Sequence, residues 1–164
     1  MMSADITVSV DASEAKELFA KTADRASSFR LVFEEARAFM AAANAENFAT
    51  GGLPVGGWAP LQPETAAWKV RHGMPPIPLV GDGALFRSLV DLHGPPNDIN
   101  ATSASFGTDV EYAQFHQYGA PRAHLPVRRV VFEPPGFATM LEHAIVKHLE
   151  PGPATMSDLK ALFR

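Results

Sequence analysis

The stretch FGTDVEYAQFHQYGAPRAHLPVRRVVF, residues 106–132, carries the most information about the fold of this chain. A Gly-Thr-Asp turn opens it, an aromatic segment follows, Gly119 breaks the chain again, and a Pro-Arg-Arg sequence leads into a β-like run. This order is typical of a rigid surface element and contains no catalytic pattern. We expect Tyr112 and Phe115 to point inward and residues 119–126 to form an outward contact loop.

Composition places the chain among ordinary globular proteins. Its 164 residues suffice for one domain with its own core, and 46% hydrophobic with 20% charged residues is typical of that class. The net charge of -4 argues against binding nucleic acid through overall charge. Because the chain has no cysteine, disulfides, zinc–thiolate sites and thiol catalysis are excluded.

The sequence predicts no membrane association. No apolar run approaches the ~20 residues that a membrane helix needs, and the N-terminus lacks the basic and apolar regions of a signal peptide. We therefore expect a chain that resides in the cytosol or inside an assembly built there.

Hydrophobic periodicity predicts one long helix near the N-terminus. Residues 6–10 alternate apolar and polar side chains, as in a half-buried strand. From Asp11 to about Phe48 the apolar residues recur at steps of three and four, as on one face of a helix. Such a helix is longer than a compact domain needs, so it either breaks near Ser27 and Ser28 or projects from the domain.

Shorter elements follow between loops rich in the 14 prolines and 12 glycines. We expect helices starting at Pro63 and spanning 110–118 and 136–149, strands in 101–106 and 128–132, and either a helix or a strand in 84–92. The predicted fold class is α+β: the long N-terminal helix and shorter helices pack on a small, mostly antiparallel sheet. One domain is expected over residues 1–150, followed by a tail at 151–164.

The histidines do not form a convincing metal or acid–base motif. His116 and His124 flank the Gly119 loop and could hold a metal in a small hydrolase. However, Glu111 lies five residues before His116, not four, and the H-E-x-x-H pattern is absent. A hydrogen-bonded structural histidine is the favoured interpretation. The sequence also lacks a nucleophile elbow, a P-loop and a dinucleotide fingerprint, so we predict no enzymatic activity, no cofactor and no metal.

Large aromatic and basic side chains are the candidates for an interface. Trp58 and Trp68 either anchor a partner or close the core. Arginines 122, 128 and 129 could contact nucleic acid or pair with acidic residues of a neighbouring subunit, and the second use suits an acidic protein better. The complete set of protein-interface candidates is Trp58, Trp68, Tyr118, Arg122, His124, Arg128 and Arg129.

Taken in order, several short motifs resemble the virion morphogenesis (tail completion) family of contractile-tailed bacteriophages. They are W-x-P-L with a following T-x-x-x-K (Trp58, Pro60, Leu61, Thr65, Lys69), a leucine–glycine turn with L-x-x-S (Leu79, Gly83, Leu85, Ser88), G-T-x-x-x-Y-A-x-x-H-x-x-G (Gly107, Thr108, Tyr112, Ala113, His116, Gly119) and P-x-R (Pro126, Arg128). The resemblance runs from about residue 30 to 135, and the specificity lies in the order and spacing of the pieces.

The resemblance implies a structural protein of the phage neck. Such a protein completes the tail and joins it to the head as part of a homo-oligomeric ring, here expected to be six-fold, around the DNA channel. Its expected partners are tail terminator, tail tube or sheath proteins and head connector proteins, with DNA only as passing cargo. The alternatives are the metal-dependent hydrolase at His116 and His124, and an adaptor that binds peptides near Trp58 and Trp68.

Overall fold

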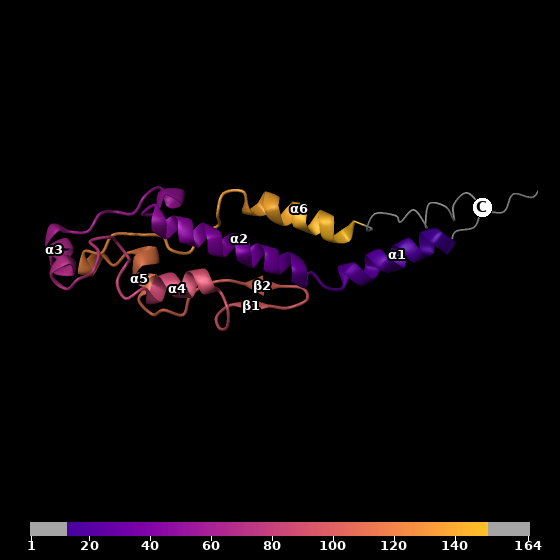
Figure 1. The fold of residues 1–164 in the computed structure, drawn as a ribbon, viewed down its shortest axis with the longest axis horizontal. Helices are drawn as coiled ribbons and strands as arrows, with labels where there is room; N and C mark the ends of the chain where they lie inside the picture. The colour runs from indigo at the N-terminus through magenta and orange to yellow at the C-terminus, as the bar shows by residue number, and fades with distance from the viewer. Residues whose placement is uncertain (1–12, 151–164) are drawn as a thin grey trace, which may run out of the picture.

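The computed structural model describes residues 13–150, which form an elongated molecule built around one central helix, α2 (Figure 1). The α-helices are α1 (Ser13–Ala26), α2 (Arg30–Ala49), α3 (Pro63–Arg71), α4 (Ala84–Asp91), α5 (Ala113–Tyr118) and α6 (Phe137–Leu149). Two short 3-10 helices, η1 (Leu53–Val55) and η2 (Pro121–Ala123), lie in loops. No helix in this part of the chain is long and apolar enough to cross a membrane.

The α+β fold class is confirmed, with a minimal sheet. Strands β1 (Asp98–Ile99) and β2 (Ala104–Ser105) pair antiparallel, with Asp98 opposite Ser105 and Ile99 opposite Ala104. The predicted strand at 128–132 is wrong: this segment is extended but joins no sheet among residues 13–150. The predicted strand at 6–10 lies outside the described residues.

The long N-terminal helix is divided at Ser27–Phe29, close to the predicted break. The Ser27 amide donates to the Asp24 carbonyl (3.1 Å), and the Ser27 hydroxyl donates to the same oxygen (2.6 Å). Serine hydroxyls that bond nearby carbonyls compete with helical hydrogen bonding. The Phe29 amide then donates to the carbonyl of Ala101 (2.7 Å), so α2 begins anchored to the loop beside β2.

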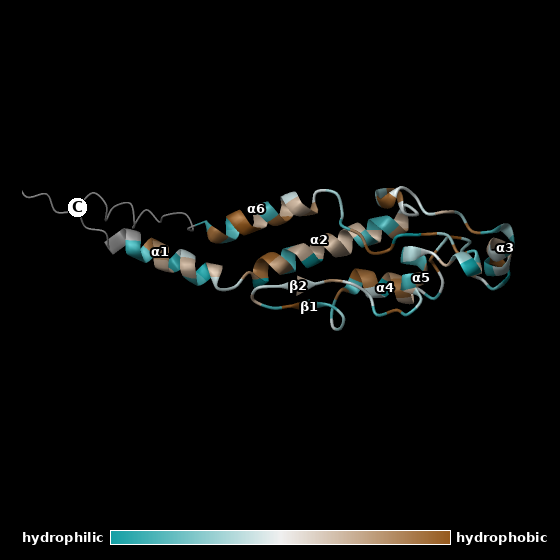
Figure 2. Ribbon diagram, turned by 180° about the vertical axis from the view of Figure 1, so that it is seen from behind, coloured by the Kyte–Doolittle hydropathy of each residue, from teal (hydrophilic) through white to brown (hydrophobic). Residues whose placement is uncertain are grey.

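The main core lies on one side of α2. Figure 2 shows α4 as predominantly hydrophobic, and its Leu85 and Leu89 are each 1% exposed. They join Phe48 of α2 and Trp58 in one cluster, in which the two aromatic rings meet edge to face with centroids 5.1 Å apart. Helix α6 packs along the other side of α2 (Figure 1), antiparallel to it.

Two ordinary boundary signals explain where α3 begins. Pro63 starts α3, where its missing N–H costs no hydrogen bond, and Glu64 follows in the first turn.

Helix α5 is shorter than predicted and begins at Ala113. The segment at 84–92, which allowed either assignment, is helical over Ala84–Asp91.

Gly52 is required where the chain turns under Trp58. Its φ is +87°, and an added Cβ would lie 2.4 Å from Cδ1 of the indole. We expect Gly52→Ala to lower the free energy of unfolding by about 2–4 kcal/mol, the sum of a strained left-handed backbone and an overpacked core. Urea denaturation measures this loss.

The matched control is Gly56→Ala. Its φ is similar, +92°, but an added Cβ meets nothing within 4 Å, so only the backbone strain of about 1 kcal/mol remains. Equal losses for the two variants would show that contact with Trp58 is not the reason for glycine at position 52.

Candidate interaction surface

The motif residues Trp58 and Arg128 fasten two distant segments together. The Arg128 guanidinium donates from Nε to the carbonyl of Ala59 (2.8 Å) and from Nη2 to that of Pro60 (2.9 Å). In return, the indole Nε1 of Trp58 donates to the carbonyl of Arg129 (2.9 Å). The W-x-P-L and P-x-R motifs, nearly seventy residues apart in the chain, are therefore in direct contact.

Burial of these two side chains corrects the sequence prediction. Trp58 is 8% exposed and Arg128 only 4%, so both are interior residues of the single chain and not surface anchors. For Trp58 the alternative interpretation, that it closes the core, is the one that holds. The pKa of Arg128 is lowered by its burial, and two carbonyl dipoles compensate part of the lost hydration.

Gln117, which the sequence did not single out, holds the segment after Arg128. Its Oε1 accepts from the amides of Val130 (2.9 Å) and Val131 (3.0 Å), and its Nε2 donates to the Val131 carbonyl (2.8 Å). The Arg128 amide donates to the carbonyl of His116 (2.7 Å). These bonds to α5 replace the sheet partner that the β-like sequence of residues 128–132 predicted.

Three further motif residues serve the same purpose. The buried Lys69 donates from Nζ to the carbonyls of Ile77 and Val80, which ties the proline-rich loop to α3, and burial lowers its pKa. The hydroxyls of Ser88 and Thr108 lie 2.7 Å apart and connect α4 to the Gly-Thr-Asp turn.

The aromatic residues at the start of α5 and within it, Tyr112 and Phe115, face the opposite way from the prediction. Tyr112 and Phe115 are 43% and 49% exposed, whereas Ala113 is 6% exposed and joins the core. Because α5 has only six residues and lies close to the core, the inward position is filled by the small side chain of Ala113. The expected outward placement of the contact loop agrees with the exposure of its residues 121–124.

His116 and His124 have unrelated environments. His116 is half-buried, its Nδ1 has no hydrogen-bond partner, and its pKa is lowered by burial and, secondarily, by the charge of Arg128. His124 is exposed at the end of η2. Within residues 13–150, no group of three or more His, Cys, Asp or Glu side chains could hold a metal ion.

The remaining candidates lie on the surface near one end of the molecule. Tyr118 is 79% exposed and lines a groove with Val127, Arg129 and Val131. Trp68 is 46% exposed and stacks on His72, with ring centroids 4.2 Å apart. Arg122 and His124 are exposed as well. Figure 1 shows α3 and α5 at the same end of the elongated chain.

Comparison of this chain with family models, with curated proteins and with solved structures gave no match.

Arg128 and Arg129 offer a direct test of the two roles. We expect Arg128→Ala to lower the free energy of unfolding by about 2–4 kcal/mol, because the buried Arg128 side chain and its two charged hydrogen bonds to the carbonyls of Ala59 and Pro60 are lost. Arg129→Ala removes a neighbouring exposed side chain and should stay within about 0.5 kcal/mol of the parent. Equal effects of the two substitutions in urea denaturation would contradict the structural role of Arg128.

His116 should make stability depend on pH below neutrality. Its pKa is lowered in the folded chain, so the unfolded chain binds more protons once the pH falls below the ordinary value of about 6.5. Stability should therefore fall with decreasing pH, with a slope from this group of at most about 1.4 kcal/mol per pH unit, until the folded-state pKa is reached. Thermal unfolding of the parent and His116→Gln between pH 7.5 and 5 measures the difference, and parallel profiles would contradict it.

Proposed function

We propose that this chain is a structural protein of the neck of a contractile-tailed bacteriophage. It completes the tail and joins it to the head as one subunit of an oligomeric ring around the DNA channel. The resemblance of its motifs to the virion morphogenesis family is the starting point. The contacts, the exposed apolar side chains and the net charge of the chain add three lines of support.

The observation that carries the proposal is that the spaced motif residues act as one set in space. Trp58 bonds to the segment of Arg128, Arg128 bonds back beside Trp58, and Ser88 bonds to Thr108. The order and spacing of the motifs thus correspond to specific contacts that shape this fold. A chance alignment of common residues would not require such contacts, so the convergence supports the family resemblance.

Exposed apolar side chains at both ends of the molecule favour repeated subunit contacts. Phe19 of α1 is 74% exposed and Tyr118 of α5 is 79% exposed, and Figure 1 shows these two helices toward opposite ends of the molecule; Leu31 at the start of α2 and Leu53 of η1 are each 70% exposed. Large exposed apolar side chains can serve as anchors that a partner surface buries. Contacts between two different patches on identical subunits are heterologous and close into rings when the rotation permits.

The charge of the chain suits a ring through which DNA passes. Non-specific DNA binding comes from basic residues that neutralise phosphates, and a net charge of -4 does not favour such binding. In the proposed assembly a six-fold ring meets head connector proteins on one side and tail terminator, tube or sheath proteins on the other. DNA is then cargo, and the virion neck is the location.

Electron microscopy of particles made without the protein tests this function. Deleting its gene from the phage that encodes it should leave filled heads and tails that are not joined, and supplying the chain in trans should restore joined particles. Reconstruction of the restored neck should show density for this chain as a ring. Normally joined particles in the deletion would overturn the proposal.

A further inference from the structure

Helix α1 projects from the body of the molecule as an arm, and few residues of the body pack against it. Its side chains from Lys16 to Ala20 are all exposed, and Phe19 is 74% exposed. Its contacts with the body lie at its C-terminal end, where Arg25 donates to the Glu150 carbonyl and His148 bonds the Arg25 carbonyl (3.0 Å). An isolated helix of 14 residues is marginal in water, so α1 gains stability from a surface that covers it.

The open face of α1 is small and apolar, with one positive charge. At 3.6 residues per turn, Phe19 shares a face with Lys16, Ala23 and Ala26. The charged pair Glu17 and Lys21, joined at 2.8 Å, lies on the opposite side of the helix. Figure 2 shows this mixture of hydrophilic and hydrophobic segments along α1.

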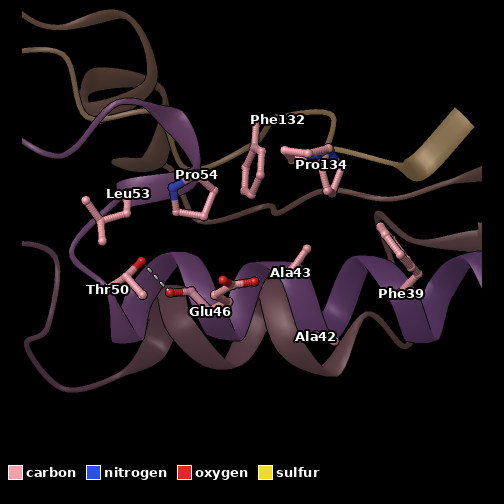
Figure 3. A pocket seen from close by; sticks show the side chains of 10 residues that line it. Phe39, Ala42, Ala43, Glu46, Thr50, Leu53, Pro54, Phe132 and Pro134 are labelled. Atoms are coloured by element: carbon pink, nitrogen blue, oxygen red, sulfur yellow. Dashed lines mark hydrogen bonds between the residues drawn. The ribbon is translucent and has the colours of Figure 1, made fainter.

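A groove of matching character lies along the C-terminal half of α2. Figure 3 shows it between α2 and the chain around Phe132 and Pro134, with a volume of about 500 Å³. Ala42 and Ala43 form part of its α2 side and leave room for a large side chain, while Leu53 contributes an exposed apolar side chain. Glu46 is the one charged residue among those that line it.

The two surfaces agree in length and in charge. The groove follows α2 from Phe39 to Thr50, about 16 Å at ~1.5 Å per residue, and the open face from Lys16 to Ala26 measures about 15 Å. The single charge of the face is positive and that of the groove is negative. Within residues 13–150, neither Lys16 nor Glu46 forms an ion pair.

The chain cannot place its own α1 in its own groove in this fold. Figure 1 shows α1 extending beyond the end of α2 that is farther from the groove. From Ser13 to the middle of the groove at Glu46, the two helices and their junction span roughly 50 Å at ~1.5 Å per helical residue. The α1 helix that can enter this groove is therefore that of a second copy of the chain.

We propose that α1 of one copy places its Phe19 face in the α2 groove of the next copy, with Lys16 beside Glu46. Each subunit then gives one arm and receives one, which makes the contact heterologous. This inference rests on the proposed ring, because it names the contact through which neighbouring ring subunits join.

Cysteine cross-linking tests the contact in a chain that has no cysteine of its own. In the double variant F19C/A43C, oxidation should join successive copies into a ladder of covalent oligomers, both in the purified chain at high concentration and in joined particles. The matched control D24C/A43C carries its arm cysteine on another face of α1 and should form no ladder. An oxidised F19C/A43C sample without a ladder in either setting, or with only an internal disulfide, overturns the inference.

Charge reversal provides a second, independent measurement. K16E and E46K should each weaken self-association by about threefold to fivefold, as expected for an exposed ion pair, and the combination K16E/E46K should restore most of it. Analytical ultracentrifugation gives the association constants. A combination weaker than either single variant overturns the pairing of Lys16 with Glu46.

The outcomes separate this inference from the proposed function. A ring in the neck reconstruction without the F19C/A43C ladder would remove the arm contact and leave the neck role standing. A ladder in the purified chain, together with normally joined particles in the gene deletion, would keep the contact and remove the neck role.

Discussion

The paired contacts between residues 58–60 and 128–129 are the interaction on which the rest of the structure depends. Arg128 donates to the carbonyls of Ala59 and Pro60, and the Arg129 carbonyl accepts from Trp58 and from the buried Asn47 (3.3 Å). Buried backbone groups must find partners, and a sheet of two short strands offers few. In this chain, polar side chains supply what strand pairing supplies in other α+β domains.

The same constraint operates throughout the molecule. Asn44 of α2, 2% exposed, donates to the carbonyl of Leu89 near the C-terminal end of α4, where helical carbonyls lack internal partners (2.7 Å). Lys69 and Gln117 likewise provide hydrogen-bond partners for backbone carbonyls in two loops. Long irregular segments can therefore pack against α2 although they are not part of a sheet.

Sequence patterns predicted the elements whose signals are local. The break near Ser27, the start at Pro63 and the final helix from residue 137 follow from side chains within a few positions of each boundary. The strand predicted at 128–132 does not form, because the backbone amides of this segment bond to the side chain of Gln117 in α5 and not to a neighbouring strand. No periodicity reveals such a partner.

The candidate surface was predictable only in part, for the same reason. Tyr118 and Trp68 are exposed aromatic residues, as the interface interpretation requires. Trp58 and Arg128 belong to the same aromatic and arginine residue types that made them candidates, but they are buried. Whether an aromatic or arginine side chain lies inside depends on which carbonyls the tertiary fold brings to it. The apolar groove along α2 escaped sequence analysis because alanines and prolines in separate segments form it.

The division of the N-terminal helix at Ser27–Phe29 gives the molecule an adjustable geometry. The direction of α1 is set by a few fixed points: the Phe29 amide on the Ala101 carbonyl, the Phe29 ring against His148, and His148 on the carbonyls of Arg25 and Ser28. None of these points belongs to the core around Trp58. Substitutions at this junction can therefore change the angle between α1 and α2, and with it the curvature and diameter of the proposed ring, without a change in the core around Trp58.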